Sequence, residues 1–125
     1  MIKSILLVGL GGAIGSILRY LSAMLVNKYW NNAFPLATFL INMSGCLLIG
    51  MLMAFIEKQS GISDNLRLLF VTGFCGGYTT YSAFAYENTT LVTNGQTLIA
   101  FAYIAASVLA GLLFVWLGMM AGRWF

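Results

Sequence analysis

Apolar residues dominate four long segments of the chain, and short polar stretches separate them. The segments lie at about residues 4–26, 35–56, 65–92 and 97–122. A transmembrane helix needs about 20 mostly apolar residues to cross the hydrocarbon layer. Each segment is long enough, so the pattern predicts an all-α membrane protein. We expect one four-helix transmembrane domain over residues 1–125, with both chain ends on the same side of the membrane.

The third segment differs from the others because small and polar residues gather at its centre. Two adjacent glycines, two adjacent threonines, a serine and four aromatic residues fall between Gly73 and Phe84. At membrane depth, irregular backbone is tolerated only where protein buries it or where it lines a polar cavity. A helix interrupted at mid-membrane often marks an ion or substrate site. We expect such a break here; a simple kink supported by neighbouring helices is the alternative.

The composition agrees with a membrane protein and excludes several functions. Hydrophobic residues make up 61% of the chain and charged residues 7%, against about 25% charged in soluble domains. With no histidine and three acidic residues, metal clusters and Ser-His-Asp catalysis lack their ligands and bases. A net charge of +3 is too small and scattered for nucleic-acid binding. Cys46 and Cys75 lie in apolar segments and are expected to be small buried hydrophobes.

The few basic residues predict the orientation. The chain-end side carries four of them, and the other side has Lys28, with Arg19 inside the first segment; the four are Lys3, Lys58, Arg67 and Arg123. Lysine and arginine favour the cytoplasmic side, so both termini are expected inside. The first segment continues past Arg19 without a cleavage pattern, which favours a retained helix over a signal peptide.

Glycines at helical spacing predict close helix packing. Gly11 and Gly15, and likewise Gly118 and Gly122, are four residues apart, the spacing that lets helix backbones approach each other. The spacing leaves open whether the partner helix belongs to the same chain or to another. Four helices are too few to enclose a polar path, so we expect a homo-oligomer.

Polar and aromatic residues form lines on three of the predicted helices. Residues three or four apart share a helix face, and these lines are Thr38 and Asn42; Tyr81, Phe84 and Glu87; Tyr103 and Ser107. Each hydroxyl alone is more simply explained by a bond to its own helix. The Asn42 amide has donors that its own helix backbone cannot fully use. Together the lines predict a shared narrow path.

The chemistry of this path suits a small, hard anion. Its groups are mainly the Asn42 amide, hydroxyls that include Ser82, and aromatic ring edges, which carry the positive end of the ring quadrupole. No ring of acidic side chains marks a cation pore. Carbonyls freed at the break would instead suit a hard cation. Arg19 and Glu87 are the ionisable residues expected at membrane depth, where such residues are functional candidates.

Three motifs resemble the small bacterial fluoride channels of the Fluc or CrcB family over almost the whole chain. They are GGAIGSILRY at residues 11–20, PLATFLINMSG at 35–45, and GFCGGYTTYSAF at 73–84. The resemblance implies passive fluoride export across the bacterial plasma membrane, by an antiparallel, dual-topology dimer with two pores. It implies no enzymatic activity and no organic cofactor.

The resemblance also implies roles for individual residues. Carbonyls of Gly76 and Thr79 from both subunits would hold a central structural sodium ion. Tyr81 and Phe84 would be the pore aromatics, with Asn42, Tyr103 and Ser107 beside them. The chain departs from the family pattern at Tyr81, usually phenylalanine, at Ala83, usually threonine, and at Gly111, where some relatives have serine.

Other interpretations remain open from the residues. The basic bias toward one side fits a fixed orientation better than dual topology, so a heterodimer with a homologous chain is an alternative to the homodimer. A proton-coupled small multidrug transporter is a second alternative, but it needs a carboxylate in its first helix, and residues 4–26 contain none. A non-transporting assembly subunit would explain the small residues but not the polar lines.

Overall fold

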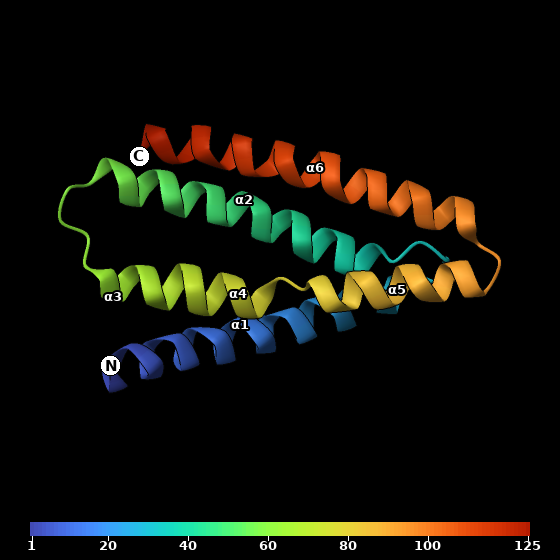
Figure 1. The fold of residues 1–125 in the computed structure, drawn as a ribbon, viewed down its shortest axis with the longest axis horizontal. Helices are drawn as coiled ribbons and strands as arrows, with labels where there is room; N and C mark the ends of the chain where they lie inside the picture. Colours follow the sequence, from blue (N-terminus) through green and yellow to red (C-terminus); the bar gives the residue numbers. More distant parts are fainter.

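The computed structural model describes all of residues 1–125, and all of the regular secondary structure is helical, with no strand (Figure 1). The all-α prediction is therefore confirmed. The helices follow in the order α1 (Ile2–Tyr29), α2 (Leu36–Lys58), α3 (Asp64–Arg67), the π-helix η1 (Leu68–Cys75), α4 (Gly76–Tyr78), α5 (Tyr81–Thr93) and α6 (Thr97–Trp124).

Three of these helices are long and apolar enough to cross a membrane. They are α1, α2 and α6, with mean hydropathies of 1.6, 2.2 and 2.5 over their most apolar stretches. The third predicted span, residues 65–92, is instead divided among α3, η1, α4 and α5. The large apolar side chains exposed along the outer faces, such as Leu98, Leu109 and Trp116, are typical of helices that contact lipid or another subunit.

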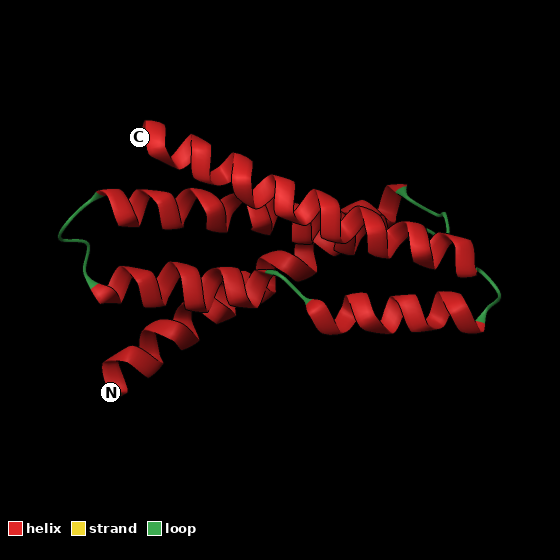
Figure 2. Ribbon diagram, turned by 45° about the horizontal axis from the view of Figure 1, so that its top comes forward, coloured by secondary structure: helices red, strands yellow, loops and turns green.

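The helices run lengthwise beside one another, and both chain ends lie at the same end of the molecule (Figure 1). α2 packs along α6 on one side, while α1 packs against η1 and α4 on the other. Figure 2 shows α1 crossing the others obliquely. The connection between α2 and α3 lies at the same end as the termini, and the α5–α6 turn lies at the opposite end.

Glycines allow the close helix contacts on both sides. A Cβ atom at Gly11 would overlap the carbonyl oxygen of Leu69, and one at Gly15 would overlap that of Phe74. On the other side, a Cβ at Gly118 would overlap the Leu47 carbonyl. The small-residue spacing thus serves packing within the chain, which answers the question that the sequence left open.

A small core lies where α5 and α6 meet the start of α2. Leu91, Ala100 and Tyr103 are buried there, and Tyr103 is wholly inaccessible. Around them pack Phe34, Phe39, Phe84 and Ile99. This aromatic core joins the connection before α2 to the helix that follows the break.

Candidate functional site

The backbone interruption consists of two threonines. α4 ends at Tyr78, Thr79 and Thr80 are both extended (φ −79°, ψ 159° and φ −149°, ψ 121°), and α5 begins at Tyr81. In Figure 2 the interruption is the short loop between two stretches of helix that follow one another along the molecule and are offset sideways. Thr80 starts α5 because its hydroxyl accepts a hydrogen bond from the Ala83 N–H at 3.3 Å, the usual role of a threonine N-cap.

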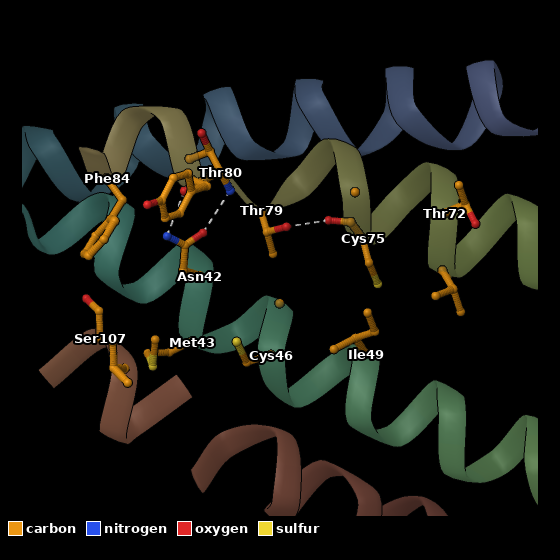
Figure 3. Close-up of a pocket in the computed structure, with 15 residues that line it drawn as sticks. Asn42, Met43, Cys46, Ile49, Thr72, Cys75, Thr79, Thr80, Phe84 and Ser107 are labelled. Atoms are coloured by element: carbon orange, nitrogen blue, oxygen red, sulfur yellow. Dashed lines mark hydrogen bonds between the residues drawn. The ribbon is translucent and has the colours of Figure 1, made fainter. Parts of the chain in front are cut away.

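Asn42 of α2 holds the interruption with both ends of its amide. Its Nδ2 donates to the Thr80 carbonyl at 3.0 Å, and its Oδ1 accepts from the Thr80 N–H at 2.9 Å. Both bonds are drawn in Figure 3. Sequence reasoning placed Asn42 on a polar path but did not foresee that Thr80 engages both amide atoms. One N–H of the amide remains for another acceptor.

The two hydrogen bonds between Asn42 and the Thr80 backbone change the hydrogen bonding of Gly76. In an uninterrupted helix the Thr80 N–H would donate to the carbonyl four residues earlier, that of Gly76, but here it donates to Asn42. Gly76 is exposed, with nothing within 4 Å of the Cβ position. The Thr79 side chain instead bonds back to the Cys75 carbonyl at 2.9 Å. The Gly76 carbonyl is thus free of its usual helical donor.

Arg19 of α1 approaches the interruption from the side. Its guanidinium donates to the Thr79 carbonyl, with 3.5 Å between nitrogen and oxygen. A carbonyl oxygen has two lone pairs, so this long bond leaves one acceptor position on Thr79. Arg19 therefore contacts the break itself.

An open cleft of about 540 Å³ runs along one face of the molecule, between α2, η1, α5 and α6 (Figure 3). Six of the residues singled out from the sequence line it: Asn42, Gly76, Thr79, Tyr81, Phe84 and Ser107. In Figure 3, Phe84 and Ser107 approach the same space from different helices. Apolar residues including Met43, Ile49 and Val108 form much of the remaining wall.

A second cavity of about 530 Å³ lies beside α1 and is lined by three more of the polar candidates. Arg19, Thr38 and Ser82 line it, together with Ser16 and Tyr86. Thr80 lines both cavities. The interruption is therefore the wall that the two cavities share, and the predicted line of Thr38 and Asn42 divides between them.

Aromatic rings connect the cleft to the core. Phe84 packs edge-to-face against Tyr103, with centroids 5.0 Å apart at 73°, and Tyr81 lies 5.9 Å from Phe84. Tyr81 is 80% exposed, whereas Tyr103 is wholly buried and lines neither cavity. Tyr103 and Ser107 thus occupy different environments despite sharing a helix face.

Glu87 lies apart from both cavities, near Thr38 and Tyr103. Its Oε1 and the Tyr103 hydroxyl are buried and form no hydrogen bond of good geometry. Buried polar groups are normally paired, and the Thr38 side chain, which lies near both, is a candidate partner for each. The sequence pattern placed Glu87 on the same face as Phe84, but it did not show the proximity to Tyr103.

The residue that sequence reasoning missed is Phe34, whose ring also contacts Tyr103, with centroids 5.2 Å apart. It lies in the polar connection between α1 and α2, outside every predicted helix. The only sequence signal was its position next to the single proline, Pro35.

Comparison with known proteins gives a consistent result. The family described as CrcB-like protein, Camphor Resistance (CrcB), matches residues 6–119. A protein of Flavobacterium psychrophilum is 48% identical over 121 residues, covering 97% of this chain and 98% of its own. One of Chloroflexus aurantiacus is 42% identical over 98% of both chains, and one of Rhizobium meliloti is 45% identical over 95% of both. All three are named fluoride-specific ion channel FluC. The chain therefore belongs to the CrcB family, together with these FluC proteins.

Proposed function

We propose that this chain forms a fluoride-selective channel that lets fluoride leave the cell passively across the plasma membrane. The observation that carries the proposal is the nearly full-length match, at 48% identity, to a protein named as a fluoride-specific ion channel. Three long apolar helices supply a membrane domain. The relatives are named as channels, and the chemistry proposed here needs no catalytic residue.

The cleft offers the groups that a dehydrated fluoride ion requires. Phe84 and Tyr81 bring aromatic rings to it, Ser107 brings a hydroxyl, and Asn42 brings the remaining N–H of its amide. Ring edges carry partial positive charge, and hydroxyl and amide donors form strong bonds to a small anion. Fluoride would pass between these groups, with Thr38, Ser82 and Arg19 in the second cavity forming the approach.

The open side of the cleft supports a dimeric channel. Tyr81 is 80% exposed there, beside apolar residues of α2 and α6. A second, antiparallel copy covering this face would enclose the polar groups and repeat them by two-fold symmetry. Two such copies would contain two pores. A homologous chain of opposite orientation would serve as well as an identical one.

The interruption supplies ligands that fit a structural sodium ion. Unwound backbone carbonyls coordinate sodium in other membrane proteins. The Gly76 carbonyl has lost the N–H of Thr80 to Asn42, and Gly76 and Thr79 both line the cleft. These two carbonyls, repeated in the second copy, would hold the ion between the subunits. Its role would be to fix the interface, without taking part in fluoride movement.

A proton-coupled multidrug transporter is less well supported. Such a mechanism needs a membrane-embedded carboxylate on the first helix, and α1 has no acidic residue. The glutamate nearest the polar groups, Glu87, is on α5 and lines neither cavity. No observation on this chain favours drug transport over anion passage.

Fluoride release from liposomes tests the proposal directly. Purified protein is reconstituted into vesicles loaded with potassium fluoride or with potassium chloride, and anion release is followed with ion-selective electrodes after valinomycin is added. We expect rapid release of fluoride and release of chloride no faster than from protein-free vesicles. Equal release of both anions, or fluoride release at the rate of empty vesicles, would show that the proposed function is wrong.

A further inference from the structure

Phe34 is the one aromatic residue of the α1–α2 connection that reaches the core. Its carbonyl oxygen accepts two hydrogen bonds, one from the indole N–H of Trp30 and one from the N–H of Leu36, each at 2.8 Å. Pro35 follows it, and a proline ring fixes its own φ and restricts the residue before it. The backbone of Phe34 is thus fixed from both sides, which is unusual for a residue in a loop.

The ring of Phe34 belongs to a chain of edge-to-face contacts that leads to the cleft. It contacts Tyr103 with centroids 5.2 Å apart at 64°, and Tyr103 contacts Phe84 at 5.0 Å and 73°. Tyr103 has no exposed surface and lines neither cavity. Phe34 and Phe84 are therefore linked by their contacts with one fully buried ring, that of Tyr103.

We propose that Phe34 is a positioning residue that sets the orientation of the Phe84 ring by fixing Tyr103. The inference rests on the proposed function, in which the edge of Phe84 faces the anion. Protein interiors are packed too densely to absorb the loss of a ring without movement of its neighbours. Without Phe34, Tyr103 gains room to tilt, and Phe84 loses the contact that holds its edge toward the path.

Three variants separate a positioning role from general packing. Phe34→Leu removes the ring, and Phe34→Tyr keeps it. Phe39→Leu is the matched control, because Phe39 packs on the same core and pairs with Phe34 at 5.6 Å, but forms no ring pair with Tyr103. Each variant is purified, checked for dimer content, and reconstituted for the same fluoride and chloride release measurement as the wild type.

We expect Phe34→Leu to slow fluoride release about threefold to tenfold, the range of a lost aromatic pair. Phe34→Tyr should stay within about twofold of the wild type, because it keeps a ring against Tyr103. Phe39→Leu removes a ring that pairs with Phe34 but not with Tyr103, so it should slow fluoride release less than Phe34→Leu does. A background variant adds a second readout. In Phe84→Leu the ring that Phe34 positions is absent, so adding Phe34→Leu should cause no further slowing.

The outcomes distinguish this inference from the function on which it rests. If the wild type releases no fluoride, the proposed function fails. If the wild type releases fluoride and Phe34→Leu matches it, only the positioning role fails. Equal slowing by Phe39→Leu, failure of Phe34→Tyr to restore release, or additive slowing with Phe84→Leu would each overturn it. If Phe34→Leu does not assemble, Phe34→Met takes its place, and loss of assembly in both would assign Phe34 to packing alone.

Discussion

At the scale of single residues, Asn42 is the residue whose expected role differs most from the role that the structure gives it. Its position four residues from Thr38 marks it as a polar group within a span, which indicates a partner outside its own helix. The structure provides that partner as the backbone of Thr80, bonded at both amide atoms. Asn42 thus supports the interruption first, and only its remaining N–H is available to an ion.

Replacing Asn42 tests this supporting role. Asn42→Ala removes both hydrogen bonds to the half-buried Thr80 backbone, and each such bond contributes about 0.5–1.5 kcal/mol. Asn42→Asp keeps an acceptor for the N–H but places a carboxylate oxygen against the Thr80 carbonyl. We expect both variants to lower the thermal unfolding temperature of the detergent-solubilised protein and to slow fluoride release.

Asn88→Ala is the matched control for these variants. Asn88 also carries an amide near the site, but its Nδ2 bonds to the Phe84 carbonyl of its own helix. Removing it should therefore perturb the interruption less than removing Asn42. If Asn42→Ala abolished fluoride release at an unchanged unfolding temperature, Asn42 would act only as a donor in the pore. Its two bonds to Thr80 would then not contribute to stability.

At the scale of elements, the contact of α1 with η1 and α4 depends on small residues. Gly11 and Gly15 meet backbone atoms of η1 and α4, whereas Gly9, on the same helix, has nothing within 4 Å of its Cβ position. Gly73 and Gly77 provide the matching surface, because Cβ atoms there would approach backbone of Val8 and Gly12. The helix that carries the interruption is thus fixed to α1 by backbone contact.

Alanine at these glycines should separate close packing from helix propensity. Gly11→Ala forces the helices apart, and overpacking of this kind costs about 1–3 kcal/mol. Gly9→Ala adds the same methyl group in open space, where alanine favours the helix by about 1 kcal/mol. We expect only Gly11→Ala to lower the unfolding temperature and slow fluoride release. Equal stability of the two variants would contradict the contact between α1 and η1.

The elements also show what could and could not be predicted from the sequence. Hydropathy alone placed helix ends within a few residues, because the apolar runs are bounded by polar turns such as residues 93–96. The π-helix η1 was not predicted, since nothing in local propensity distinguishes it from an α-helix. Phe34 was missed for a related reason: a loop residue acquires its role only from the tertiary contact with Tyr103.

At the scale of the whole molecule, the arrangement of the helices brings most of the basic residues to one end. Both termini and the α2–α3 connection lie at one end (Figure 1), and this end carries most of the lysines and arginines. There the Lys58 ammonium also donates to the Arg123 carbonyl at 3.0 Å, which joins the last turns of α2 and α6. The cytoplasmic placement of this end stays a prediction.

If the carbonyls of Gly76 and Thr79 from both copies hold a sodium ion, as proposed, sodium should stabilise the assembled dimer. A ligand that binds only the assembled state favours that state by mass action. We expect protein purified in N-methylglucamine chloride to dissociate into monomers on dilution more readily than protein in sodium chloride, as measured by size-exclusion chromatography with light scattering. Potassium chloride serves as a control for ionic strength. The same dimer fraction in all three salts would remove Gly76 and Thr79 as ion ligands.

The two extended threonines have an electrical consequence as well. Aligned peptide dipoles give a helix a partial negative charge at its carboxyl end and a partial positive charge at its amino end. The interruption therefore creates a negative end at Tyr78 and a positive end at Tyr81, separated by Thr79 and Thr80. A chain with three acidic residues and no histidine thereby gains two local fields of opposite sign from its backbone, and the Arg19 guanidinium contacts the carbonyl of Thr79 between them.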